Sequence, residues 1–205
     1  MNGALSNNSR SRTAGLIIVR SSNKNDKNDK NDKKYEMLLQ HRADSKQHGA
    51  NKLALIGGHI DKNESAIHAA YREGIEEASL DKLCSYHKFK KNAYKLSSGK
   101  FTCYLLNIDD ISEAKNSNSV NNVNNIKWQP KPSKEFRHEL NTNIFKNGHT
   151  WVDFNDIEKC VKNNVGISDN RKSNQNDKLF IWDLTIDFIR NNAKKIGNKL
   201  ANNSL

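Results

Sequence analysis

Short apolar runs separated by polar segments predict a sheet. Segment 13–20, TAGLIIVR, is rich in β-branched residues and is typical of a buried strand. Segment 35–42, YEMLLQHR, predicts the second strand of a hairpin with it. Further strands are expected at 53–56, 100–108 and 150–154.

Two segments have the periodicity of helices instead. Within 58–80, apolar or small residues recur at i, i+3, i+4 and i+7, which predicts one buried stripe on a helix: Ile67, Ala70, Tyr71, Gly74, Ile75 and Ala78. Asn63 and Ser65 are both suited to cap its start. Segment 179–190 is apolar on most sides and predicts a helix docked on the sheet, with a solvated face marked by Asp183, Asp187 and Arg190.

Three polar segments lie between these elements and are expected to be surface loops, at 21–34, 113–134 and 163–178. The first contains a three-fold Asn-Asp-Lys repeat in the turn of the predicted hairpin, where an insertion costs little free energy. A length of 205 residues favours one domain. We expect it to span 13–190, after a disordered N-terminus at 1–12 and before a polar, basic tail at 191–205.

The formal net charge of +11 favours polyanionic partners such as nucleic acid, acidic membranes or phosphorylated substrates. Segment 86–95 interleaves lysines with Phe89 and Tyr94. It has two interpretations: a surface that contacts RNA, or an ordinary strand whose outward positions are lysine.

The three cysteines, Cys84, Cys103 and Cys160, show neither metal-ligand spacing nor a pairing pattern. No apolar run resembles a signal peptide or a membrane span. We therefore expect a cytoplasmic, intracellular protein that is not secreted.

The candidate chemistry lies in the helix of segment 58–80. Glu76 and Glu77 follow Glu73 by three and four positions, so the three carboxylates should lie together, away from the packed stripe. Their mutual repulsion favours a hard divalent cation, Mg²⁺ or Mn²⁺. The Gly57-Gly58 pair before the helix permits close backbone approach to a phosphate or metal. The alternative interpretation is a solvated acidic helix face.

These charges resemble the signature of the Nudix hydrolases. The matching positions are a glycine, a glutamate, an arginine-glutamate pair, a glutamate pair, a small residue and an aliphatic residue: Gly58, Glu64, Arg72, Glu73, Glu76, Glu77, Ser79 and Leu80. The chain departs from the pattern at Ile56, Gly74 and Ser79, where the family usually has proline, an aliphatic residue and glycine. None of these departures removes a charged group, so we expect them to affect helix stability more than catalysis.

The resemblance implies an α/β fold, a mixed β-sheet sandwiched between helices, and metal-dependent hydrolysis of a diphosphate linkage. It implies that Glu73, Glu76, Glu77 and the Gly58 carbonyl hold the metals. Arg72 would orient Glu73, and Glu64 would brace the loop against the helix. A further acidic ligand from outside this segment would be Glu135 or Glu139. Which glutamate acts as the general base stays open.

The substrate has three alternatives. The first is a small molecule in which a nucleoside diphosphate is linked to another group. The second is capped RNA, with the protein as a decapping enzyme, and the third is a Nudix-fold protein that binds without catalysis. Candidate substrate-binding residues are Arg42, His59 and Trp128, whereas Trp151 and Trp182 lie in patterns typical of a core. The oligomeric state is open.

Overall fold

The computed structural model describes residues 12–22, 34–43, 49–112, 128–140, 146–163, 167–168 and 178–202. Most of the predicted N-terminal segment and of the three predicted loops lie outside the described residues. The exceptions include 128–134, which is a loop ending in a turn, and a two-stranded sheet in the third loop, formed by β8 (Ile167–Ser168) and β9 (Lys178–Leu179).

A seven-stranded mixed sheet forms the centre of the molecule. Its strands are β1 (Thr13–Ser21), β2 (Tyr35–His41), β3 (Leu53–Ala54), β4 (Ile56–His59), β5 (Tyr94–Ser98), β6 (Phe101–Asn107) and β7 (His149–Asp153). The order is β3-β2-β1-β6-β5, with β4 paired to β1 and β7 paired to β2. Among the strands of this sheet that the structure describes, β1 and β6 are the only parallel pair. The strands predicted at 13–20, 35–42, 100–108 and 150–154 are confirmed to within a residue at each end, including the hairpin of β1 and β2. The strand predicted at 53–56 is divided into β3 and β4, and β4 continues through the glycine pair to His59.

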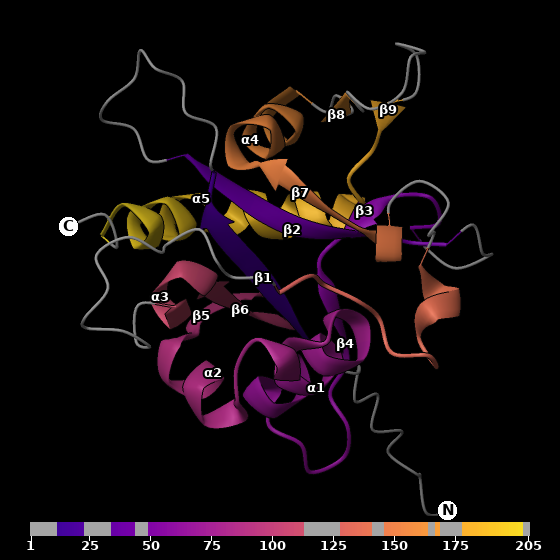
Figure 1. The fold of residues 1–205 in the computed structure, drawn as a ribbon. Coiled ribbons are helices and arrows are strands. Elements are labelled where there is room, and N and C mark those ends of the chain that lie inside the picture. Colours follow the sequence, from indigo (N-terminus) through magenta and orange to yellow (C-terminus); the bar gives the residue numbers. More distant parts are fainter. Residues whose placement is uncertain are drawn as a thin grey trace, which may run out of the picture.

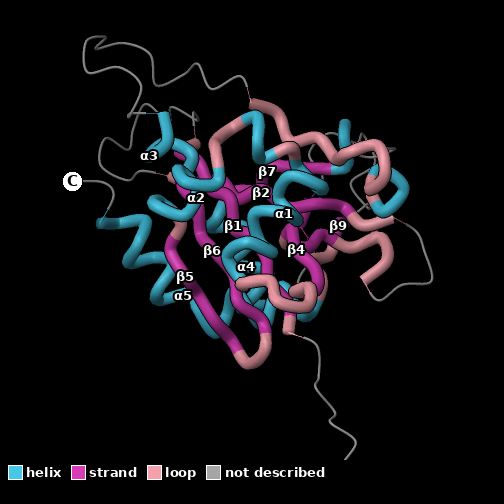
Figure 2. Tube along the Cα trace, turned by 90° about the horizontal axis from the view of Figure 1, so that it is seen from below, coloured by secondary structure: helices cyan, strands magenta, loops and turns pink. Residues whose placement is uncertain are grey.

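Helices cover both faces of this sheet (Figures 1 and 2). One face carries α1 (Ala66–Ala78), α2 (Tyr86–Asn92) and α3 (Ile108–Ser112), and the other carries α4 (Phe154–Asn163) and α5 (Asp183–Asn202). Alternate residues of β1 enter the two cores: Ile17 packs towards α4 and α5, and Leu16 towards α1. The expected α/β sandwich is confirmed. Within the described part of the chain, no helix combines the length and apolar character needed to cross a membrane.

The predicted final helix, at 179–190, differs from the observed helix α5 at both ends. It begins at Asp183 rather than 179, because Leu179 belongs to β9 and Ile181 bridges to Leu53 of β3. It continues to Asn202, so a polar tail from 191 is wrong for 191–202. The physical reason is that Ile196 and Leu200 extend the buried stripe onto the sheet.

Segment 86–95 is not a strand throughout. Residues 86–92 form α2, whose first turn is capped by the Ser85 hydroxyl accepting from the Lys88 N–H. Phe89 is fully buried and its ring packs against Tyr71 of α1. Only the residues from Tyr94 onward join β5. The aromatic residue Phe89 therefore serves the core, which removes it as a candidate for base stacking.

Ile196→Ala tests whether packing of the C-terminal half of α5 on the core contributes to the free energy of unfolding. Because Ile196 is 0% exposed, the variant should lose about 3 kcal/mol of unfolding free energy, measured by urea denaturation. Exposed Lys195→Ala is the control and should change it by less than about 0.5 kcal/mol. Equal stability of both variants would contradict a docked helix end.

Candidate active site

The site begins where the chain passes from β4 into α1. At Gly57 the backbone has φ of +150°, and an added Cβ would lie 2.6 Å from the Gly15 Cα of β1. At Gly58 an added Cβ would lie 2.8 Å from the Glu73 Cδ and 2.9 Å from its Oε2. A side chain at Gly57 would meet the backbone of β1, which pairs with β4 here, and a side chain at Gly58 would displace the Glu73 carboxylate. The Gly58 backbone is thereby brought next to the Glu73 carboxylate.

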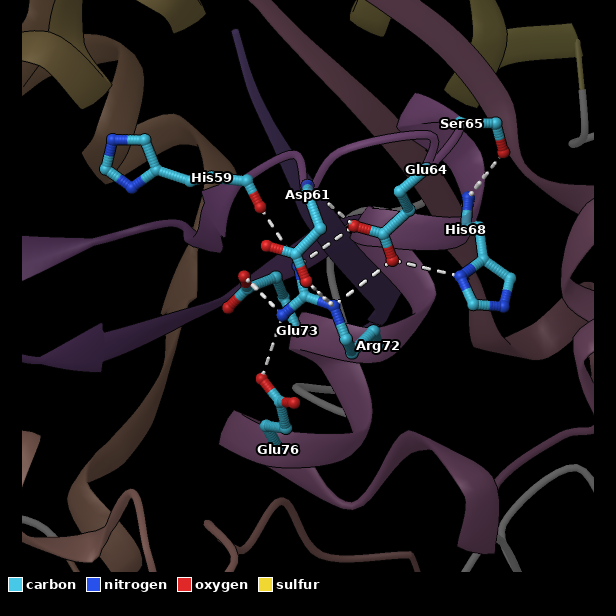
Figure 3. Close-up of polar contacts among 8 residues, drawn as sticks. All are labelled: His59, Asp61, Glu64, Ser65, His68, Arg72, Glu73 and Glu76. Carbon is cyan, nitrogen blue, oxygen red and sulfur yellow. Dashed lines mark hydrogen bonds and ion pairs between the residues drawn. The ribbon is translucent and has the colours of Figure 1, made fainter. Parts of the chain in front are cut away.

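Arg72 joins the loop to the helix (Figure 3). Its Nε and Nη2 donate to the two carboxylate oxygens of Glu64, each at 3.1 Å. Its Nη1 donates to Glu73 Oε1 at 2.9 Å and to Glu76 Oε2 at 3.1 Å. Nη2 also donates to the carbonyl oxygen of His59 at 2.9 Å. One guanidinium thus fixes three carboxylates and the loop backbone.

Glu64 is the strongest partner of Arg72. Hydrogen bonds from Arg72 lower the pKa of Glu64 from 4.5 to about 2, and the same contact raises the pKa of Arg72. The helix start beside it is capped by Ser65, whose hydroxyl accepts from the His68 N–H at 3.3 Å, so Ser65 rather than Asn63 is the cap. Glu64 therefore ties the loop to the first turns of α1.

Two of the three helix carboxylates are buried, contrary to the expectation that all three face away from the packed side. Glu73 is 7% and Glu77 5% exposed. The reason is that β4 and the glycine loop pack over this side of α1, and the Gly57 N–H donates to Glu77 Oε2 at 2.9 Å. Burial raises the pKa of both groups, that of Glu77 to about 8. A solvated acidic face is therefore excluded for these two residues.

Gln40 of β2 is a supporting residue that the sequence reasoning missed. Its side chain is buried, donates to the Leu55 carbonyl at 3.1 Å, and lies close enough to Glu77 to favour the charged carboxylate by hydrogen bonding. The available signal was a lone amide inside an apolar strand, since an uncharged polar residue at such a position needs a buried partner.

A cavity of about 640 Å³ opens beside these carboxylates. Its acidic part is lined by Gly57, Gly58, Glu73, Glu77 and Glu139. Arg42 and His59, two of the candidate substrate-binding residues, also line it, together with aromatic and apolar side chains that include Phe101, Phe136, Trp182, Leu184 and Phe188. The cavity therefore combines a carboxylate cluster with a largely apolar region.

Of the two candidate acids outside the helix, only Glu139 reaches this cavity. It lies in the 3₁₀ turn Arg137–Glu139, which is joined to the end of β2: the Ala43 N–H donates to the Glu139 carbonyl at 2.8 Å, and Arg42 forms a β-bridge with Leu140. Its charge also contributes to raising the pKa of Glu77. Glu135 is exposed and does not line the cavity.

The donor set suits a hard divalent cation, although the side chains are not gathered around one point. Among the described residues, no three acidic, histidine or cysteine side chains are grouped closely enough to hold a metal ion as they stand. Glu73, Glu77 and Glu139 nevertheless line one cavity, and repulsion from Glu73 and Glu139 adds to the raised pKa of Glu77. A Mg²⁺ or Mn²⁺ ion would relieve that repulsion with oxygen ligands of the preferred kind. Glu76 is held by Arg72 and does not line the cavity.

The tryptophans are distributed differently from the prediction. Trp128 does not line the cavity; its Nε1 donates to the Ser79 carbonyl at 3.1 Å and its ring packs on the α1 side of the core. Trp182, predicted to be core, is half-buried and lines the cavity. Trp128 is therefore part of the loop packing at the end of α1, and Trp182 is a candidate substrate-binding residue.

Two departures from the family pattern have local explanations. An added Cβ at Gly74 would lie 2.8 Å from the Leu80 Cδ2, so the helix is packed too closely there for a side chain. Ser79 adopts the left-handed conformation at φ 55° that ends α1, and its hydroxyl donates to the Lys131 carbonyl at 2.6 Å. This bond fastens the loop 128–134 to the helix end, which a glycine could not do.

Family comparison agrees with this geometry. The NUDIX domain model matches residues 28–157, so the chain belongs to the NUDIX family. Membership confirms the resemblance seen in the sequence. Nudix hydrolases generally use divalent metal ions.

Solved structures to which the chain is similar include three from different organisms. A MutT/nudix family protein from Enterococcus faecalis is 24% identical, with 47% of this chain and 36% of that chain covered and a TM-score of 0.34. An Ap4A hydrolase from C. elegans, in a binary complex, is 20% identical over 74% of this chain and 84% of that one, with a TM-score of 0.39. A mutT/nudix family protein from Listeria innocua is 13% identical over 94% and 97%, with a TM-score of 0.45. The chain thus spans little more than a third of the Enterococcus protein, and no curated protein matches it.

Glu64→Gln tests the ion pair that holds the loop. Because the folded-state pKa of Glu64 is lowered from 4.5 to about 2, its contribution is present above pH 4.5 and is lost as pH falls towards 2. The variant should lose about 1–2 kcal/mol at neutral pH, since Arg72 stays partly exposed and solvent screens the pair. Its stability should also fall less steeply over that acid range.

The measurement is chemical denaturation at a series of pH values. Glu158→Gln on α4, on the other face of the sheet, is the matched control. Parallel pH profiles for wild type and Glu64→Gln would contradict the assigned role of the pair.

Proposed function

We propose that this protein is a divalent-metal-dependent hydrolase that cleaves the pyrophosphate linkage of a small substrate in which a nucleoside diphosphate is joined to another group. The observation that carries the proposal is the mixed lining of the cavity, which includes both carboxylates and aromatic and apolar side chains. The carboxylates suit metal-bridged phosphates, and the aromatic and apolar side chains suit the nucleoside. Metal dependence and substrate class both belong to the proposal.

Glu73, Glu77 and Glu139, with the Gly58 carbonyl, would hold the cation, and Glu76 would join them if Arg72 releases it. When bound, a divalent cation neutralises phosphate charge and makes water more acidic. Like charges at these carboxylates, which raise the pKa of Glu77, support this assignment.

The protein's own contribution is positioning. Arg72 holds the Glu73 carboxylate from one side and the loop carbonyl of His59 from the other. The Gly57 N–H holds Glu77. These contacts fix the carboxylates before substrate arrives, so binding needs less reorganisation. One of the glutamates accepts the proton of the attacking water, and its identity is left to mutagenesis.

A small substrate is favoured over capped RNA by the lining of the cavity. Its volume of about 640 Å³ lies in the range of small-molecule sites. No lysine is among the described residues that line it. The exposed lysines of α2, such as Lys90 and Lys91, lie elsewhere on the surface. The net charge of +11 is the observation that keeps capped RNA as the second candidate.

Glu139→Gln and Glu135→Gln form a matched pair that tests the ligand outside the helix. Glu139→Gln should lower kcat at least about 100-fold with Mg²⁺ or Mn²⁺, about 2.7 kcal/mol of transition-state stabilisation. Glu135→Gln should stay within about twofold of wild type. Glu73→Gln is the positive control for loss of activity. The reverse ranking of the two variants would contradict the assignment of Glu139.

The substrate class is tested with a panel of nucleoside triphosphates, ADP-ribose, dinucleoside polyphosphates and capped RNA. We expect turnover of free nucleotides, lost in Glu73→Gln and only weakly dependent on salt. Release of a cap nucleotide from RNA, with a rate that falls steeply as salt rises, would replace this proposal with decapping. Absence of turnover for every compound would favour a binding protein.

A further inference from the structure

Large apolar side chains lie exposed to solvent at and beside the cavity. The large hydrophobic residues exposed among those described are Tyr94, Phe180 and Leu184. Two of them flank Trp182, with Phe180 51% and Leu184 61% exposed. Leu184 lines the cavity with Trp182, and so does Phe136, which directly precedes the turn that carries Glu139. Exposed apolar surface beside a carboxylate cluster indicates a ligand with both an apolar and an anionic part.

Trp182 is held firmly at this position by backbone pairing with β3. The Trp182 N–H donates to the Leu53 carbonyl at 2.8 Å, and the Leu53 N–H donates to the Phe180 carbonyl at 2.8 Å. Gly49, with φ of +81°, lies so close to the indole that an added Cβ would be 2.9 Å from the ring Cδ2. The indole is therefore fixed before a ligand binds, which reduces the entropy lost on binding.

Arg42 completes this part of the cavity. Its Cζ lies 5.2 Å from the centroid of the Trp182 ring, within the range of a cation–π contact. Both side chains line the cavity. A planar guanidinium beside an indole offers a stacking surface for an aromatic ring, because both groups are flat and polarisable.

The chain contains an internal comparison for this pair. Arg20 lies 4.1 Å from the centroid of the Trp151 ring, also as a cation–π contact, and neither residue lines the cavity. Trp151 lies in β7 and packs on the core. Two arginine–tryptophan pairs of the same chemistry therefore differ in access to the candidate active site, which separates binding effects from stability effects.

We propose that Arg42 and Trp182 form the platform on which the nucleobase of the substrate stacks, and that Arg42 acts there through its planar guanidinium rather than as a phosphate ligand. This inference rests on the proposed function, since it places the nucleoside half of the same substrate. The phosphates then extend towards Glu73, Glu77 and Glu139 in the other part of the cavity.

The test measures binding by calorimetry with Mg²⁺ present, using nucleoside 5′-monophosphates and ribose 5-phosphate as probes. The two kinds of probe share the phosphate and the sugar, and only the first has a base. Wild type should bind at least one monophosphate on the order of tenfold more tightly than ribose 5-phosphate. Trp182→Leu should remove that difference and leave the affinity for ribose 5-phosphate unchanged. Trp151→Leu is the matched control and should retain the difference.

Two further variants separate stacking from charge and guard against a misfolded Trp182→Leu. Trp182→Phe keeps an aromatic plane and should retain most of the affinity. Arg42→Lys keeps the positive charge but loses the plane, so it should weaken monophosphate binding at least about fivefold with ribose 5-phosphate unaffected. Folding of each variant is checked by its thermal melting curve.

Two results would overturn the platform. In one, wild type binds ribose 5-phosphate as tightly as every monophosphate. In the other, Arg42→Lys leaves the affinity for monophosphates unchanged, or lowers the affinity for monophosphates and for ribose 5-phosphate equally. Trp182→Leu, if it folds, gives the same result. A wild-type protein that binds a monophosphate through Trp182 but hydrolyses no member of the substrate panel would support the platform and disprove the proposed function. Loss of hydrolysis in Glu73→Gln with intact monophosphate binding would support both the platform and the proposed function.

Discussion

Burial of two carboxylates against a backbone loop is the constraint on which the rest of the site depends. Glu73 and Glu77 are nearly inaccessible, and removing a carboxylate from water strongly disfavours its charged form. Three local features offset that cost: the Arg72 guanidinium, the Gly57 N–H and the buried amide of Gln40. Because these groups come from α1, the β4 loop and β2, the acidic cluster exists only when the sheet and helix have assembled.

Close backbone approach is the second requirement. A side chain at Gly57 would meet the backbone of β1, and a side chain at Gly58 would displace the Glu73 carboxylate. At the other end of α1, Ser79 ends the helix and fastens the following loop through its hydroxyl. The departures from the family pattern at Gly74 and Ser79 are thus accommodated by packing and hydrogen bonding specific to this chain, and every charged group of the pattern stays in place.

The lining of the cavity combines two kinds of chemistry. Carboxylates from α1 and the 137–139 turn line it, and so do Trp182, which directly precedes α5, and Leu184 and Phe188 of α5, beside Asp187 of the same helix. Pairing of Ile181 with Leu53 sets the position of Trp182, so β3 links the base-binding surface to the edge of the same sheet. A substrate with a planar base and a charged diphosphate fits this mixed lining, because each half meets side chains of matching polarity.

The sequence by itself determined most strands of the main sheet and the main helix, and it indicated Glu64, Arg72 and Glu73 as candidate site residues, because hydrophobic period and charge spacing are local properties. It could not determine which face of α1 is covered, since β4 reaches that face only through its pairing with β1. It also could not choose between Glu135 and Glu139, and it assigned Trp182 to the core and Trp128 to the substrate, whereas Trp182 is the one that lines the cavity. Those choices depend on the Arg42–Leu140 bridge and on the Leu53–Ile181 bridge, which join segments distant in the chain. The local pattern therefore specified the chemistry, and long-range backbone pairing decided which outlying side chains reach the cavity.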